Sequence, residues 1–114
     1  IPKNNIRIIA KDPKVIFDGK STLITAFILS NVTGVIIDGT NIRYYRANGI
    51  EIDSGYGNRI IKNTINNTFN FGISILDSSN NLIWKNEVSK CSDGIRLSSA
   101  STTTMVEIMF CLII

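Results

Sequence analysis

The motif Gly-Ile-Glu-Ile at residues 49–52 returns as Gly-Ile-Ser-Ile at 72–75 and as Gly-Ile-Arg-Leu at 94–97. The three copies begin 23 and then 22 residues apart. In each copy, branched apolar residues alternate with other types, as in a strand that buries one side. Self-similarity at a fixed spacing of this size is the signature of a repeat architecture, in which each period supplies one structural unit.

Further positions match at fixed offsets after each glycine. They are Ser54, Asp77 and Ser99 five residues on, Asn58, Asn81 and Thr103 nine residues on, and Asn63, Asn86 and Ile108 fourteen residues on. Between them, Ile60 matches Ile83 and Ile65 matches Val88. Each period therefore predicts an alternating strand, a polar turn, a second strand, an asparagine and a third short strand.

One such period cannot bury its own apolar side, but stacked periods can, with neighbouring strands about 4.7–4.9 Å apart. Composition supports many short strands with turns between them, because the chain of 114 residues has 22 Ile and 13 Asn against 6 Leu and 4 Ala. We predict an all-β solenoid of about 4–5 coils of 22–24 residues. Ile50, Ile73 and Ile95 should then lie in one column.

Asn63 and Asn86 fall at the same turn of successive coils. An amide has both a donor and an acceptor, so stacked amides can satisfy one another and the backbone of the turn. We predict a structural asparagine ladder at these two positions, rather than a ligand site.

The earlier sequence fits a less regular version of the repeat. Residues 35–39 (Val-Ile-Ile-Asp-Gly) align with 59–63, which puts Gly39 at the ladder position, and residues 15–19 (Val-Ile-Phe-Asp-Gly) have the same form. Residues 6–9 predict another strand. We expect one domain over 1–114, with opening coils over about 1–48, regular coils over 49–103 and an irregular tail over 104–114.

The tail loses the polar turn residues, and Ile108 replaces the ladder asparagine. Uncapped ends of a solenoid expose apolar core and strand edges, which favour association. The tail is expected either to be an altered or truncated end of a longer parent or to pack against another chain. Cys91 and Cys111 have no paired spacing, and we expect buried or free thiols rather than a bridge.

The Gly-Ile-x-Ile coils, the spaced asparagines and the two Asp-Gly turns resemble the right-handed parallel β-helix families. These include pectate-lyase-like enzymes and NosD-like periplasmic proteins. The resemblance covers roughly residues 6–103 and implies a right-handed solenoid, the hand that parallel crossovers favour. It says little about chemistry, because one fold hosts many activities. A leucine-rich repeat is the rival for this period, but it places an Asn shortly after the Leu-x-Leu strand, where this chain has Asp53, Ser54 and Gly55.

Glu51 and Asp53 are the most interesting acids. Alternation puts both on the outward face, about 6–7 Å apart along the strand, with Ser74 and Arg96 at the aligned outward positions of later coils. Paired carboxylates with a nearby base suit glycoside hydrolysis or lyase chemistry, while acids on a solvent-facing strand are equally ordinary. The chain has no polygalacturonase-like Asp and His cluster and no pectate-lyase-like Arg motif.

Aromatic residues form a second candidate set. Tyr44, Tyr45, Tyr56 and Trp84 offer flat faces to sugars, with arginines beside the first two. Trp84 follows the inward Ile83, so alternation points it outward. Aromatic side chains in turns also commonly cover the core, so a binding role and a packing role both stay open.

Other ligand classes have little support. The chain has no His and only two Cys, so we expect no transition-metal site; calcium would need oxygens from Glu51, Asp53 and Asp77. A net charge of +3 is a mild excess, so we expect no nucleic-acid partner. The apolar run at 109–114 is too short to span a membrane.

We therefore expect a β-helix domain of an extracellular, cell-surface or periplasmic protein that associates with carbohydrate and lacks a complete catalytic site in this chain. Polysaccharide is the expected partner, together with self-association through the uncapped end. The alternatives are a polysaccharide lyase or glycoside hydrolase of the pectate-lyase-like fold, and a structural spacer or adhesin coil.

Overall fold

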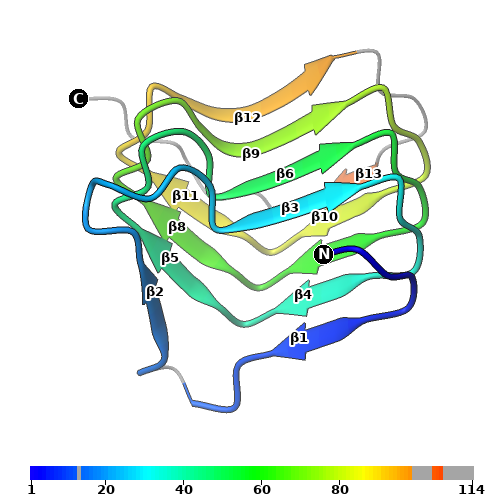
Figure 1. The fold of residues 1–114 in the computed structure, drawn as a ribbon, viewed down its shortest axis with the longest axis horizontal. Helices are drawn as coiled ribbons and strands as arrows, with labels where there is room; N and C mark the ends of the chain where they lie inside the picture. The colour runs from blue at the N-terminus through cyan, green and yellow to red at the C-terminus, as the bar shows by residue number, and fades with distance from the viewer. Residues whose placement is uncertain (13, 99–103, 107–114) are drawn as a thin grey trace.

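The computed structural model describes residues 1–12, 14–98 and 104–106. The chain winds through three parallel β-sheets, which form the sides of a solenoid of about four turns (Figure 1). Each full turn contributes one short strand to each sheet. The described residues contain no helix, and the prediction of an all-β solenoid is confirmed.

Within each sheet, neighbouring strands come from successive coils. Sheet A contains β1 (Arg7–Ile9), β4 (Ile36–Asp38), β7 (Arg59–Ile61), β10 (Leu82–Trp84) and β13 (Thr104–Val106). Sheet B contains β2 (Ile16–Asp18), β5 (Asn41–Arg43), β8 (Thr64–Asn66) and β11 (Glu87–Ser89). Sheet C contains β3 (Phe27–Ser30), β6 (Ile50–Asp53), β9 (Phe71–Leu76) and β12 (Asp93–Ser98). Three strands per coil also exclude the leucine-rich repeat, which has one.

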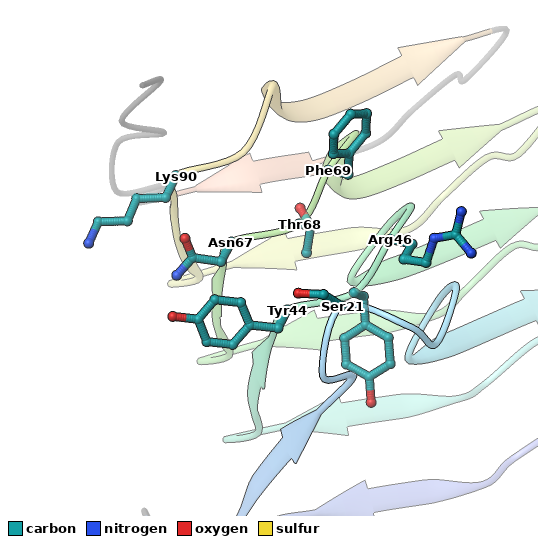
Figure 2. Close-up of a pocket in the computed structure, with 8 residues that line it drawn as sticks. Ser21, Tyr44, Arg46, Asn67, Thr68, Phe69 and Lys90 are labelled. Carbon is teal, nitrogen blue, oxygen red and sulfur yellow. The ribbon is translucent and has the colours of Figure 1, made fainter.

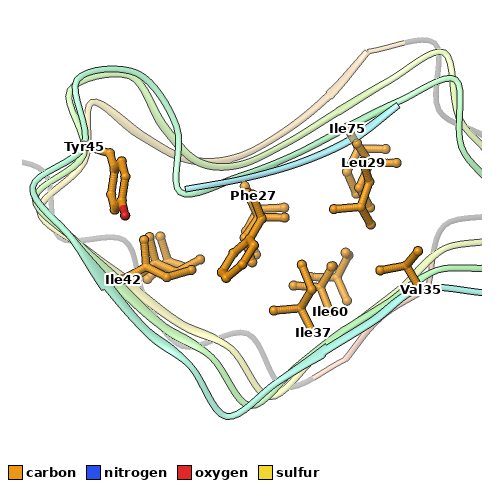
Figure 3. Close-up of a cluster of buried hydrophobic side chains, with 14 of the residues drawn as sticks. Phe27, Leu29, Val35, Ile37, Ile42, Tyr45, Ile60 and Ile75 are labelled. Atoms are coloured by element: carbon orange, nitrogen blue, oxygen red, sulfur yellow. The ribbon is translucent and has the colours of Figure 1, made fainter. Parts of the chain in front are cut away.

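The predicted isoleucine column is present in sheet C. Ile50 pairs with Ile73, and Ile73 pairs with Ile95. Phe27 extends the column downward by pairing with Ile50. Seen along the stack, buried side chains of successive coils overlap one another inside the three sheets (Figure 3). The core is thus a set of vertical aliphatic columns rather than a single central cluster.

The predicted asparagine ladder is confirmed. Asn63 donates from its backbone N–H and from Nδ2 to Oδ1 of Asn86, at 3.0 and 3.1 Å. Each amide also donates to a strand carbonyl of the preceding coil, Asn63 to Ile37 and Asn86 to Ile60. Both asparagines are almost completely buried. Their hydrogen bonds therefore satisfy the backbone polar groups of the sharp turn between sheets A and B, which water does not reach.

One alignment behind this ladder is wrong by a residue. Strand pairing puts Ile37 opposite Ile60, so Thr40 and not Gly39 occupies the ladder position. The N–H and hydroxyl of Thr40 both donate to Oδ1 of Asn63, at 2.9 and 2.6 Å. Gly39 instead stands where the chain needs a positive φ, at 74°. The Asp-Gly pair was a genuine turn signal, but it marked the residue before the ladder.

A second ladder runs through the turn between sheets C and A. The backbone N–H and Nδ2 of Asn58 donate to Oδ1 of Asn81, at 3.0 and 3.2 Å. Oδ1 of Asn58 accepts the backbone N–H of Val35. The repeat of these asparagines was visible in the sequence, but their role as a ladder was not predicted.

The opening coils depart from the regular spacing. Thr33 and Asn4, which contact each other on neighbouring coils, are 29 residues apart, whereas later contacts span 23. The strand predicted at residues 6–9 is confirmed as β1. Residues 15–19 and 35–39 have the same form in the sequence, but they occupy different places in the coil, because β2 lies in sheet B and β4 lies in sheet A. Thr103, Ile108 and Cys111 lie outside the described residues.

Candidate functional site

A pocket of about 450 Å³ opens at the corner between sheets B and C, where the chain leaves each strand of sheet B (Figure 2). Its lining comes from the turns that follow β2, β5, β8 and β11. The lining residues are Ser21, Tyr44, Tyr45, Arg46, Asn67, Thr68, Phe69 and Lys90. The pocket is therefore built by stacking, since no single coil supplies it.

Backbone hydrogen bonds hold these turns against one another. Ser21 donates its N–H to the Tyr44 carbonyl at 2.8 Å, and Phe69 donates to the Tyr45 carbonyl at 3.1 Å. The hydroxyl of Ser92 donates to the Phe69 carbonyl at 2.6 Å from the coil above. The walls of the pocket are thus fixed by the same parallel ladder that builds the fold.

One column of unusual backbone projects side chains into the pocket. Arg43 pairs with Asn66, and Asn66 with Ser89, so the next residues, Tyr44, Asn67 and Lys90, occupy equivalent positions. All three have a positive φ, at 59°, 55° and 54°. A single left-handed residue turns the chain sharply after the strand. The same three side chains line the pocket.

The aromatic side chains around the pocket differ in exposure. Phe69 is 76% exposed and Tyr44 is 42% exposed, so both present ring surface to solvent. Tyr45 is only 7% exposed and belongs to the hydrophobic core. Burial raises the pKa of the Tyr45 hydroxyl, and the charge of Asp18 raises it further. Tyr45 therefore forms the floor of the pocket rather than a face open to a ligand.

Arg43 contacts both Asp18 and the Tyr44 ring. The Nε–H of Arg43 donates to Oδ2 of Asp18 at 3.0 Å, and its guanidinium lies 5.7 Å from the Tyr44 ring centroid. The backbone N–H of Lys20 lowers the pKa of Asp18; desolvation opposes this, and Arg43 lowers the pKa further. Arg43 therefore links a carboxylate on β2 to the aromatic edge of the pocket.

The sequence pointed to Tyr44, Tyr45 and the adjacent arginine, but not to the rest of the lining. Asn67 and Lys90 were missed because they share no chemical type with the tyrosines, and the aromatic Phe69 was missed because it lies one coil away from them in the sequence. Adding the 23-residue period to Tyr44 gives Asn67 and then Lys90, and adding it to Arg46 gives Phe69. That signal was present in the repeat but was used only for the apolar and asparagine positions.

The structure places the other two aromatic candidates elsewhere. Tyr56 lies in the turn between sheets C and A, where it bridges Thr33 and Ser79 in parallel fashion. Trp84 lies half-buried on the outer face of sheet A, with the Lys85 ammonium 4.7 Å from its ring centroid. Its outward direction agrees with the alternation in the sequence. Neither residue lines the pocket.

The candidate catalytic residues lie on the outer face of sheet C. Glu51, Ser74 and Arg96 form one row across three strands, as expected from the repeat. Glu51 accepts a hydrogen bond from Nδ2 of Asn48 at 2.9 Å. Asp53 accepts one from the hydroxyl of Ser54 at 3.1 Å.

Arg96 does not approach either candidate acid. Its guanidinium lies 5.1 Å from the Phe71 ring centroid, and no ion pair joins it to Glu51 or Asp53 in the described residues. Ser74, which lies between Glu51 and Arg96 in the row, is buried despite its outward direction. The structure thus brings the three candidate residues to one face without assembling them into an acid–base group.

The described ranges contain no group of three or more His, Cys, Asp or Glu side chains placed to hold a metal ion. Cys91 is buried, and its thiol donates to the Ser89 carbonyl. Among all the described residues, no helix is long and apolar enough to cross a membrane.

The chain matches one known family, whose description is "Right handed beta helix region", over residues 14–113. The search of curated proteins and the search of solved structures each return no match. The matched range includes every regular coil and the whole lining of the pocket. With its three parallel sheets and stacked asparagines, this chain belongs to the right-handed β-helix family.

Proposed function

We propose that this chain is a carbohydrate-binding β-helix domain whose binding site is the pocket between sheets B and C. The observation that supports this most directly is the exposed Tyr44 and Phe69 rings beside the polar side chains of Asn67 and Ser21. Pockets that bind small ligands combine apolar and aromatic surface with a few well-placed polar groups. This lining has both.

The chemistry of a sugar ring fits such a lining. A pyranose has a face of C–H groups, which packs on an aromatic ring, and a rim of hydroxyls, which both donate and accept hydrogen bonds. Tyr44 and Phe69 supply the rings, and the amide of Asn67 supplies both a donor and an acceptor. The Tyr44 hydroxyl adds a further polar group.

The rigidity of the site also favours binding. The turns around the pocket are cross-linked by backbone hydrogen bonds such as Phe69 N–H to the Tyr45 carbonyl. Aromatic side chains have few rotatable bonds, so little conformational entropy is lost when they hold a ligand. A solenoid surface of this kind is ready to bind without rearrangement.

A catalytic role receives less support from the arrangement of side chains. Lyase or hydrolase chemistry requires an acid and a base positioned together, whereas Arg96 lies against Phe71 and Glu51 is held by Asn48. We therefore propose binding without turnover. Polysaccharides are abundant at cell surfaces, so the same proposal includes an extracellular, cell-surface or periplasmic location.

A glycan array followed by calorimetry tests the proposal. The purified chain should bind at least one oligosaccharide, and Tyr44→Ala and Phe69→Ala should each weaken binding about fivefold, since aromatic contacts contribute on the order of 1 kcal/mol. Tyr56→Ala is the matched control, because Tyr56 is also an exposed tyrosine, at 58% against 42% for Tyr44, and lies in another turn.

Three results would contradict this function. The first is an array with no bound glycan, which would leave the structural spacer as the better account. The second is binding that Tyr44→Ala and Phe69→Ala leave intact. The third is cleavage of a polysaccharide by the purified chain, lost on Glu51→Gln, which would establish the enzyme alternative.

A further inference from the structure

The pocket is lined by two cations and by no carboxylate: Arg46 and Lys90 contribute positive charge, and the other six lining residues are neutral. We propose that the pocket selects saccharides bearing anionic groups, carboxylate or sulfate, over their neutral counterparts. This inference rests on the proposed function and names the class of carbohydrate.

Both cations are available to a ligand. Arg46 and Lys90 are exposed, and within the described ranges neither forms an ion pair. The neighbouring acid Asp18 is already paired with Arg43, so its charge does not offset theirs. The positive charge at the pocket is therefore not neutralised by the protein itself.

The two cations come from different coils and lie on opposite sides of the pocket. Arg46 belongs to the turn after β5, and Lys90 to the turn after β11. Figure 2 shows them at the two sides, with Asn67 and Thr68 between. A single anionic group would meet one of them, so an oligosaccharide with repeated anionic groups fits the arrangement better than a monosaccharide.

The expected selectivity is moderate, because both side chains are solvated. Exposed ion pairs typically change an equilibrium by about two- to fivefold each. Together Arg46 and Lys90 should favour an acidic oligosaccharide by roughly five- to twentyfold at low salt. Charges at this exposure are screened over about 10 Å at 0.1 M salt, so the preference should shrink as sodium chloride is added.

The test compares matched glycans on the full chain. The probes are neutral cello-oligosaccharides and neutral galacto-oligosaccharides, each beside its C6-carboxylate and its sulfated counterpart. Affinities are measured for the unmodified protein, Arg46→Gln, Lys90→Gln and the double variant. Lys62→Gln is the matched control, because Lys62 is another exposed lysine with the same φ of 54°, on a different column of turns.

The acidic members should bind more tightly than the neutral ones, each single variant should reduce the ratio, and the double variant should abolish it while Lys62→Gln does not. Equal binding of neutral and acidic members would overturn the inference and leave carbohydrate binding standing. A preference that survives in the double variant would also overturn it. Failure of every probe to bind the unmodified protein would overturn both this inference and the proposed function.

Discussion

Oδ1 of Asn86 accepts two hydrogen bonds from Asn63 of the preceding coil, one from the backbone N–H at 3.0 Å and one from Nδ2 at 3.1 Å. Oδ1 of Asn63 in turn accepts two from Thr40. A buried amide at this turn thus serves three coils. Its loss leaves several backbone groups unsatisfied where water cannot replace it.

Asn63→Ala should lower the free energy of unfolding by about 2–4 kcal/mol, because it removes buried hydrogen bonds to Thr40, Ile37 and Asn86 at once. Urea denaturation followed by circular dichroism measures the change. Asn66→Ala is the control, since Asn66 is half-buried and its Oδ1 accepts a hydrogen bond from the adjacent Asn67 rather than from another coil, as far as the described residues go. Similar losses for the two variants would show that the ladder has no special role.

Gly19→Ala should destabilise the first coil and deform the floor of the pocket. A Cβ at residue 19 would lie 2.5 Å from the Tyr44 carbonyl oxygen and 2.8 Å from the Tyr45 ring, so the backbone or the buried ring must shift. Overpacking of this kind costs about 1–3 kcal/mol. Lys20→Ala in the same turn, where the side chain is exposed, should change the unfolding midpoint very little. A stable Gly19→Ala protein would refute the close approach.

Substitutions at Lys62 test whether the sharp turn between sheets A and B is strained, because Lys62 has a φ of 54° there. Lys62→Gly should stabilise the protein by roughly 0.5–1 kcal/mol, and Lys62→Ile should destabilise it by about 1–2 kcal/mol, because branched side chains disfavour this conformation. The same pair of changes at Arg59, in the adjacent strand β7, should have the opposite order. Thermal unfolding of the four variants distinguishes a turn effect from a general one.

Asp18 should make part of the free energy of unfolding sensitive to acid. Because its folded pKa lies below the unfolded value of 3.8, the Asp18 contribution is present above that value and is lost as the pH falls through the folded pKa. Asp18→Asn should therefore reduce the fall in melting temperature between about pH 5 and pH 2. The difference should be small, since the side chain is partly exposed to solvent. Identical pH profiles for the two proteins would contradict the assignment.

The solenoid was predictable because the sequence repeats its chemistry where packing demands it. Ile50 and Ile73 are the same residue in the same column, as are Asn63 and Asn86. A buried column accepts few residue types, and an amide ladder accepts fewer still. Positions with strict physical requirements therefore leave a period that can be read directly.

The pocket was not predictable in the same way. Its column of left-handed residues contains Tyr44, Asn67 and Lys90, which share a backbone conformation and no side-chain chemistry. The requirement acts on φ rather than on residue type. Likewise, Tyr44 and Tyr45 are adjacent and chemically identical, but the Tyr44 ring is exposed and the Tyr45 ring is buried.

The places of the first strands in the coil were not predictable for a related reason. Asp38-Gly39 and Asp18-Gly19 are similar turn signals, yet they follow strands of different sheets. A local motif specifies a bend and not its place in the coil. Where the spacing rises to 29 residues, as between Asn4 and Thr33, only the long-range pairing assigns the register.

Residues one period apart lie side by side, in the core and at the pocket alike. Nuclear Overhauser spectroscopy on the isotope-labelled chain tests this arrangement most directly. Backbone protons of Ile50 should show cross-peaks to Ile73, and those of Ile73 to Ile95, with a parallel series linking Tyr44, Asn67 and Lys90. Cross-peaks at unrelated offsets, or none between these residues in a folded sample, would contradict the stacked coil and the pocket with it.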